Sequence, residues 1–293
     1  MKNVKVNILL ALFAIVGLSL SCTTDSNSVS GSGGNSRQRM VSKIIFEDVE
    51  FDDADEYAFK YDSYGRITRV THTEIEDSYD EICHYEYYRY GYGNGLEISW
   101  DEEVHVVDGT YDATLNNKGY LSEVDYEYGH VTDEWSYTYD SKGRLKRIYN
   151  VYGDSEESIR REFTYSWSGG NIVEVRRAYG YEPDLEDYSK TIETQLSYNS
   201  KSMDIVNLDL NAAIGGWFEG LYIEVCDEHY WGDGLCGQKS KNFLTGWVYE
   251  DEDGRWVYSL KWSYDEDGYP VEVIVKSDEL EGGYYRVSIM YKS

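Results

Sequence analysis

A short motif that recurs along the chain limits its fold more than any other feature. The motif starts with Tyr or Leu followed by Asp or Asn, has Gly three positions after that polar residue, and has an apolar residue two positions further on. One copy runs from Tyr139 to Leu145. The other copies start at Tyr61, Leu115 and Tyr264, and two copies with a longer turn cover Phe163–Val175 and Leu196–Leu208.

Each position of the motif has a structural meaning. The aromatic residues ahead of it alternate with small polar residues, which is the period-two pattern of a half-buried strand. Asp140 can accept backbone N–H groups two residues on and so start a turn, and Gly143 can adopt the left-handed conformation that a bulged type I turn needs. Leu145 and Ile148 share one face only if a β-bulge follows the turn. The motif therefore predicts β-hairpins.

The repetition predicts an all-β fold, an antiparallel meander of repeated hairpins. No helical period competes with this pattern after the first 21 residues. About 12 to 16 strands are expected, more than an open twisted sheet usually carries. A closed β-barrel is favoured, with an elongated open sheet as the alternative. Its lumen would be too wide for aliphatic side chains alone, and the 31 Tyr can bury a ring while keeping the hydroxyl bonded.

The N-terminal segment has the pattern of a lipoprotein signal peptide. Two lysines precede the apolar run Ile8–Leu20, which ends just before Cys22. The run is shorter than the ~20 residues that span a bilayer. We therefore expect residues 1–21 to be a cleaved signal peptide and Cys22 to carry the lipid.

The segment after Cys22 predicts a tether between the lipid anchor and the folded domain. Residues 22–39 are rich in Ser, Gly and Asn, so they should form a flexible tether, and residues 40–293 should form a single barrel domain. The expected location is the outer membrane, where the lipid anchor binds the membrane from the cell surface or from the periplasmic face.

The net charge excludes one class of partner. The chain has 55 acidic and 27 basic residues, a formal charge of −28. A strongly acidic protein repels the phosphate backbone, so no nucleic-acid partner is expected.

The motif also carries a resemblance. Tyr139-Asp140-Ser-Lys-Gly143-Arg-Leu145 is similar to the tyrosine-aspartate repeats of bacterial cell-surface and toxin-shell proteins. The chain also resembles a family of gut-bacterial lipoproteins of unknown function with a porin-like β-barrel fold, through its leader, its tether, its length and its repeated hairpins. The resemblance implies a fold and an envelope location, and it implies no reaction and no catalytic residues.

A porin-like fold need not form a membrane pore. An inserted barrel presents a continuous apolar band to lipid on alternate strand positions. Here the segments 144–148 and 157–162 place charged residues on both faces of the strands they predict. We therefore expect a water-soluble barrel on a lipid anchor.

One segment, around residues 209–243, departs from the repeat. It concentrates Gly, Trp and Cys, and long irregular insertions in compact domains often carry function. The segment predicts a plug or flap over one barrel mouth, which can also shape a pocket. Its candidate ligand-binding residues are Trp217, Trp231 and His229, and its candidate disulfide joins Cys226 and Cys236.

No motif predicts catalysis. The chain has no Gly-x-Ser-x-Gly elbow, no phosphate-binding glycine loop and no His-Glu-x-x-His sequence. We therefore expect no catalytic residues, no cofactor and no enzyme activity.

Candidate metal ligands are weak. Asp251 and Asp265 each open an Asp-x-Asp-Gly run, but the Glu that a calcium loop needs eleven positions later is missing, so plain turns are favoured. Cys226, His229 and Cys236 lack an evident fourth ligand. The remaining histidines stand singly in strand or turn contexts, where surface or cross-strand roles are expected: His72, His84, His105 and His130. No metal site is predicted.

Two functions remain. The favoured one is a non-enzymatic binding protein whose Tyr- and Trp-lined cavity captures a glycan, a peptide or a small molecule. The alternative is a structural or assembly subunit that contacts an envelope protein partner through an exposed apolar patch. An enzyme or a membrane pore is less favoured.

Overall fold

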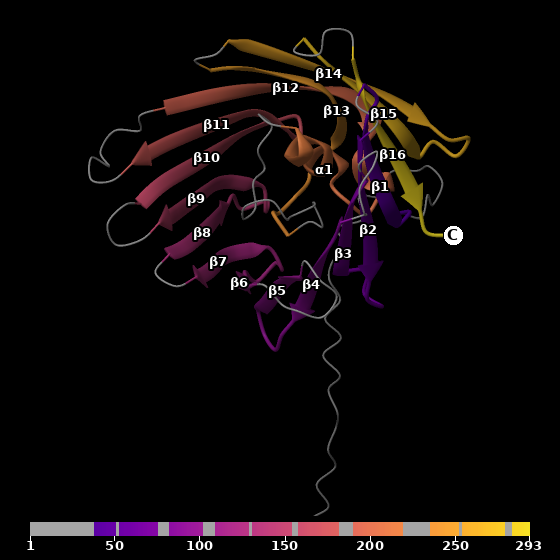
Figure 1. Ribbon diagram of the computed structural model, residues 1–293. Coiled ribbons are helices and arrows are strands. Elements are labelled where there is room, and N and C mark those ends of the chain that lie inside the picture. The colour runs from indigo at the N-terminus through magenta and orange to yellow at the C-terminus, as the bar shows by residue number, and fades with distance from the viewer. Residues whose placement is uncertain are drawn as a thin grey trace, which may run out of the picture. The chain divides into compact units, whose positions relative to one another are not determined.

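Sixteen antiparallel strands form a closed ring in the computed structural model (Figure 1). The structure describes residues 38–50, 53–75, 82–101, 109–128, 131–153, 158–181, 190–218, 235–251, 254–278 and 283–293. Cys22, the predicted signal peptide and the predicted tether up to residue 37 lie outside these ranges and remain predictions. Within the described ranges no helix is long and apolar enough to span a bilayer.

The strands of the first half are β1 Val41–Asp48, β2 Asp53–Tyr61, β3 Ile67–Ile75, β4 Ile82–Tyr90, β5 Gly95–Asp101, β6 Gly109–Leu115, β7 Leu121–Tyr128 and β8 Val131–Tyr139. Those of the second half are β9 Leu145–Gly153, β10 Ser158–Ser168, β11 Asn171–Tyr181, β12 Lys190–Ser202, β13 Asn242–Glu250, β14 Arg255–Tyr264, β15 Pro270–Ser277 and β16 Tyr285–Tyr291. Between β12 and β13 the described residues form a 3-10 turn, η1 Met203–Ile205, and a helix, α1 Leu210–Trp217.

The sheet closes by pairing its first strand with its last. Each strand pairs with its sequence neighbours, and β1 pairs antiparallel with β16, with Ile44 opposite Ile289 and Phe46 opposite Val287. The closed barrel is therefore confirmed, and the elongated open sheet is wrong. Because β1 to β16 form a closed ring, none of these described strands is an edge strand to which another chain could add.

The motif builds its turns as its chemistry predicts. Asp140 Oδ1 accepts the N–H groups of Lys142 and Arg144 at 2.8 and 3.0 Å, and Gly143 has φ of 84°. Asn116 Oδ1 makes the matching pair of bonds with Lys118 and Tyr120. The acceptor oxygen thus fixes the turn, and glycine allows the chain to reverse.

A β-bulge follows the turn. Thr138 lies opposite Arg147 while Tyr139 lies opposite Leu145, so Lys146 has no residue opposite it. Leu145 and Ile148 are both fully buried. The extra residue therefore turns both apolar side chains to the same face, which confirms the bulge that the three-residue spacing predicted.

Polar tips of aromatic residues join neighbouring hairpins. Near the motif turns, the tip of an aromatic residue donates to a backbone carbonyl near the start of the preceding strand at 2.5–2.8 Å. The bonds run from Tyr61 to Val41, Tyr139 to Leu121, Trp167 to Leu145, Trp262 to Leu244 and Tyr291 to Pro270. Phe could not make these bonds, which gives a physical reason for the excess of Tyr over Phe.

Replacing Asp140 tests the turn. We expect Asp140→Ala to lower the free energy of unfolding by about 1 to 2 kcal/mol, because two backbone N–H groups lose their acceptor. Asp140→Asn keeps the acceptor, as Asn116 does naturally, and should cost only about 0.5 kcal/mol. Urea unfolding of both variants measures the difference. Equal losses would mean that the ion pair with Arg144, and not the turn bonds, supplies the stability.

The two faces of the barrel differ in chemistry. Residues that face the lumen are mostly apolar, and the largest fully buried side chains include Trp135, Trp247, Phe46 and Phe163. The outer face carries ion pairs between neighbouring strands, namely Lys43–Glu56, Arg89–Glu97, Arg147–Glu162 and Arg286 with Glu47. An inserted barrel needs the reverse arrangement, with apolar side chains outside.

A plug fills part of the lumen. We use this name for residues 203–218 and 235–241, which include η1 and α1. Figure 1 shows α1 inside the ring of strands. Leu235 accepts the N–H of Leu121 on β7, and Ser240 Oγ accepts the N–H of Ile172 on β11. The described ends of the predicted segment thus form a plug inside the lumen, where a cover over one mouth was expected, and residues 219–234 between them lie outside the described residues. The plug is held by strands from distant parts of the ring.

Two sequence expectations about this region are wrong. The copy over Leu196–Leu208 forms no hairpin, because after Ser202 the chain enters the lumen and Val206 pairs with Arg39 instead. A helix also exists where none was expected. α1 is buried over Leu210–Gly215, and its one polar residue, Asn211, is buried as well and bonded to β13. The helix therefore shows no exposed polar face in its sequence, and Asp209 caps its first N–H groups.

Candidate functional site

The structure places one of the three predicted ligand-binding residues. Trp217, the last residue of α1, lies at the inner wall of the barrel, where its ring stacks on Phe46 of β1 with centroids 4.9 Å apart. Its Nε1 donates to Asp55 Oδ2 of β2 at 2.9 Å. His229 and Trp231 lie outside the described residues. Trp217 is therefore bonded to Asp55, a residue that the sequence analysis did not identify as a candidate.

Four polar side chains gather beside Trp217, and we call them the β2–β4 cluster: Asp55, His72, Glu74 and His84. They come from three consecutive strands. The register sets Asp55 opposite Glu74, and His72 opposite both Tyr57 and His84. Because Tyr57 is a buried lumen residue and directly opposed residues share a face, the cluster points into the barrel.

The cluster is tightly arranged. His72 Nε2 lies 2.8 Å from Asp55 Oδ1, and His84 Nε2 lies 3.5 Å from Glu74 Oε1. One potential ligand atom from each of Asp55, His72 and Glu74 lies within 4.8 Å of the others. The four side chains are between 20 and 38% exposed, so they are partly enclosed and still reachable from solvent.

Neighbouring groups orient the cluster. The His72 ring stacks on Tyr57, with centroids 4.3 Å apart and planes 5° from parallel. Burial acts to raise the pKa of Asp55, but the hydrogen bonds from His72 and Trp217 outweigh it and hold the pKa below its ordinary value. Asp55 is therefore an ionised carboxylate at neutral pH.

Sequence reasoning treated these histidines one by one. For His72 and His84 the expected cross-strand position is confirmed, because the two face each other across β3 and β4. His105 and His130 lie outside the described residues. A usable signal was present, since each histidine begins a His-x-Glu run: His72-Thr73-Glu74 and His84-Tyr85-Glu86. The alternating period puts the members of each run on one face, but only the register shows which members meet.

Cys236 is a packed thiol. Burial and the nearby Asp209 carboxylate raise its pKa, so the thiol is protonated at neutral pH and weakly reactive. Among the described residues it has no disulfide partner. Cys226 lies outside them, so the Cys226–Cys236 disulfide stays a prediction.

The turn aspartates act as structural groups. Asp265 Oδ1 accepts the N–H groups of Asp267 and Tyr269, and its Oδ2 accepts from Arg39. Asp251 Oδ1 accepts the N–H of Gly254. These bonds match the plain turns that the sequence favoured over calcium loops.

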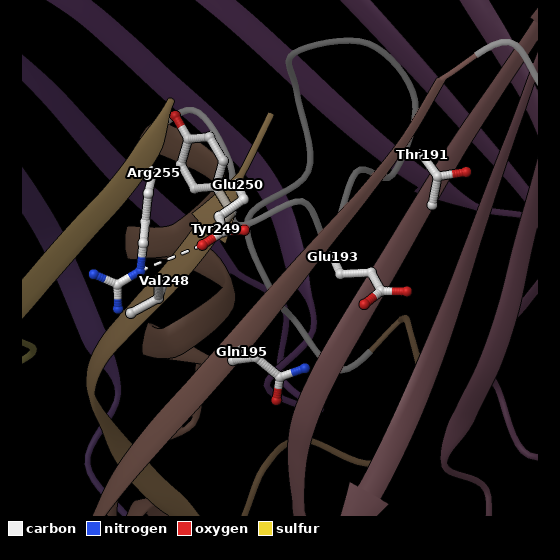
Figure 2. Close-up of a pocket in the computed structure, with 7 residues that line it drawn as sticks. All are labelled: Thr191, Glu193, Gln195, Val248, Tyr249, Glu250 and Arg255. Atoms are coloured by element: carbon white, nitrogen blue, oxygen red, sulfur yellow. Dashed lines mark ion pairs between the residues drawn. The ribbon is translucent and has the colours of Figure 1, made fainter. Parts of the chain in front are cut away.

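A hollow on the outer face is the other candidate. It has a volume of about 680 Å³ and is lined by Thr191, Glu193 and Gln195 of β12, Val248, Tyr249 and Glu250 of β13, and Arg255 of β14 (Figure 2). Glu193 lies opposite Glu250, and Arg255 Nε lies 3.6 Å from Glu250 Oε1. These charged side chains are mostly exposed, so water screens their interactions. The hollow offers a weaker basis for binding than the enclosed cluster.

The geometry defines a class of protein, a closed antiparallel barrel of sixteen strands with an apolar, plugged lumen. The chain belongs to the family described as "Domain of unknown function (DUF4595) with porin-like fold", whose model matches residues 59–272. That range covers more than half of the chain.

Two solved structures share this fold. A porin-like protein from Bacteroides uniformis is 15% identical, with a TM-score of 0.63, and the match covers 87% of this chain and 99% of that chain. A porin-like protein from Bacteroides vulgatus is 14% identical, with a TM-score of 0.57 and the same coverage. No curated protein sequence matches the chain. At this identity the likeness concerns the fold alone.

Proposed function

We propose that this protein is a non-enzymatic binding barrel, anchored by lipid at Cys22 to the outer membrane, that holds its ligand at the β2–β4 cluster. The observation that supports this most is the position of the cluster. Four hydrogen-bonding side chains lie partly enclosed on a lumen wall that is otherwise mostly apolar. An apolar site with a few convergent polar groups is typical of ligand sites.

The outer face supports a barrel that stands in water. Its ion pairs between strands would lose their hydration in lipid, at a cost that rises toward the middle of the bilayer. The lumen, meanwhile, holds buried aromatic residues and the plug. These features favour a binding protein over a pore.

The assembly alternative has less support. The large apolar side chains exposed among the described residues are Val49, Tyr64, Ile75, Tyr92, Tyr152 and Met290. They come from both ends of the barrel and from different strands and turns, and an interface core would need a continuous patch.

A thermal-shift panel tests the binding function. The panel holds oligosaccharides, short peptides, small polar molecules and divalent metal ions, each offered to the wild type and to Asp55→Asn. We expect at least one compound to raise Tm by about 5 to 10 °C at a hundredfold excess over its Kd, and only in the wild type. Glu193→Gln, on the outer hollow, is the control and should respond as the wild type does.

If no compound distinguishes the wild type from Asp55→Asn, the binding function at the cluster is wrong. Recovery of one partner protein after cross-linking in intact envelopes would then favour the assembly role.

A further inference from the structure

The residue types in the β2–β4 cluster narrow its ligand. The cluster combines two imidazoles with two carboxylates, and imidazole nitrogen is a ligand of Zn²⁺, Fe²⁺, Ni²⁺ and Cu²⁺. Ca²⁺ and Mg²⁺ prefer oxygen ligands alone. The donor set therefore fits a divalent transition-metal ion better than an alkaline-earth ion.

The spacing fits such an ion as well. Bonds of about 2.0 to 2.2 Å at a tetrahedral centre hold the ligand atoms about 3.3 to 3.6 Å apart. In the structure the atoms of Asp55, His72 and Glu74 lie within 4.8 Å of one another. His72 Nε2 and Asp55 Oδ1 are hydrogen-bonded at 2.8 Å, so an ion would replace that bond and move the two atoms slightly apart. His84 Nε2 lies 3.5 Å from Glu74 Oε1, which puts a fourth donor beside the group. The three atoms that already lie together belong to Asp55, His72 and Glu74, and His84 would complete the site by rotation of its side chain.

The residues around the cluster orient its side chains, as the residues that surround the ligands of a metal site do. In proteins, carboxylates that bind metals are themselves held by hydrogen bonds that orient them. Trp217 Nε1 donates to Asp55 Oδ2 and leaves Oδ1 directed at His72. The stacked Tyr57 ring fixes the plane of His72. The four donors thus stand on three paired strands, and the plug residue Trp217 orients one of them.

We propose that Asp55, His72, Glu74 and His84 form a binding site for one divalent transition-metal ion, with Zn²⁺ as the probe of choice. This inference rests on the proposed binding function and names the chemical class of its ligand. Trp217 acts as the residue that positions Asp55. The partial exposure of all four side chains gives the ion a path of entry from solvent.

Titration calorimetry with Zn²⁺ tests the site on chelator-treated protein without a histidine tag. We expect one saturable Zn²⁺ per chain, and affinity at least tenfold weaker in His72→Ala and in Glu74→Gln. Glu74 is the most exposed member, so Glu74→Gln should keep the fold even if His72→Ala does not. Co²⁺ gives a second readout, because a tetrahedral Co²⁺ site absorbs visible light far more strongly than Co²⁺ in water does. Each variant removes one ligand and should therefore weaken that absorption.

The acidic surface needs its own control. Glu193 and Glu250 lie opposite each other on the outer hollow, so the double variant Glu193→Gln/Glu250→Gln removes two neighbouring carboxylates outside the β2–β4 cluster. Its Zn²⁺ affinity should stay within about twofold of the wild type. Cys236→Ser tests the other candidate donors and should also bind Zn²⁺ normally.

Three results overturn the proposal: no saturable Zn²⁺ binding, binding that survives His72→Ala and Glu74→Gln, or binding lost in Cys236→Ser. If an organic compound still raises Tm only when Asp55 is intact, the metal site is wrong and the binding function stands. If neither a metal ion nor an organic compound depends on Asp55, both are wrong.

Discussion

Gly237→Ala is expected to lower the free energy of unfolding by about 2 to 4 kcal/mol. Gly237 has φ of 96°, in the left-handed region that costs an L-residue about 1 to 2 kcal/mol. A Cβ there would lie 2.6 Å from the Gly143 carbonyl oxygen and 2.7 Å from Tyr139 Cε1. Relieving such overlap by shifts of the backbone costs about 1 to 3 kcal/mol more.

The expected loss follows from how the plug is attached. Gln238 donates its N–H to the Gly143 carbonyl at 2.8 Å, so the plug pairs with the turn between β8 and β9. Gly237 is the residue that allows this approach. Moving it away weakens that bond, and the neighbouring bond between Leu235 and Leu121 as well.

Gly119→Ala is the matched control for Gly237→Ala. Gly119 has a similar φ of 79°, but no atom lies within 4 Å of the position that its Cβ would take. It should therefore lose only about 1 kcal/mol, from backbone strain. Urea unfolding of both variants measures the two losses. Equal losses would show that the plug does not depend on close approach at Gly237.

The hairpins could be predicted from sequence because their causes are local. Asp140, Gly143 and Leu145 lie within six residues, and each acts through bonds or backbone angles inside that window. The barrel follows from repeating such units until the sheet closes. The same logic failed at Leu196–Leu208, where Asn199 still accepts the N–H of Lys201 as a turn residue would. The residues after Lys201 fold differently because Met203 and Val206 are buried in the lumen, and Met203 begins the 3-10 turn η1 where a return strand was expected.

The β2–β4 cluster could not be predicted because its causes are not local. Alternation puts His72 and Glu74 on one face, but the partner of each depends on register across the segment 76–81. A slip of one residue would turn His84 to the outer face. The contact between Trp217 and Asp55 joins residues 162 positions apart and depends on the plug, whose helix shows no exposed polar face in its sequence. Predicting that contact would require knowing the three-dimensional fold of the closed barrel.

Trp217→Ala is expected to lower the free energy of unfolding by about 3 kcal/mol or more. Removing a large buried aromatic side chain typically costs about 3 to 5 kcal/mol, and partial exposure puts Trp217 near the lower end. The ring contacts both β1 and β16, because it stacks on Phe46 and forms a T-shaped pair with Tyr285, with ring centroids 5.1 Å apart. Removing the Trp217 ring therefore weakens the contact between the plug and the β1–β16 pair, the seam at which the barrel closes.

Two comparisons separate the roles of Trp217. Trp217→Phe keeps a ring against Phe46 and removes only the bond to Asp55, so it should cost about 1 to 2 kcal/mol. Trp256→Ala removes a partly buried Trp whose aromatic neighbour, Tyr249, is 6.5 Å away, and it should cost less than Trp217→Ala. Urea unfolding with the slope checked for two-state behaviour measures all three. If Trp217→Ala costs no more than Trp256→Ala, the plug is held by its backbone bonds alone, and Trp217 serves to orient Asp55 without locking the seam.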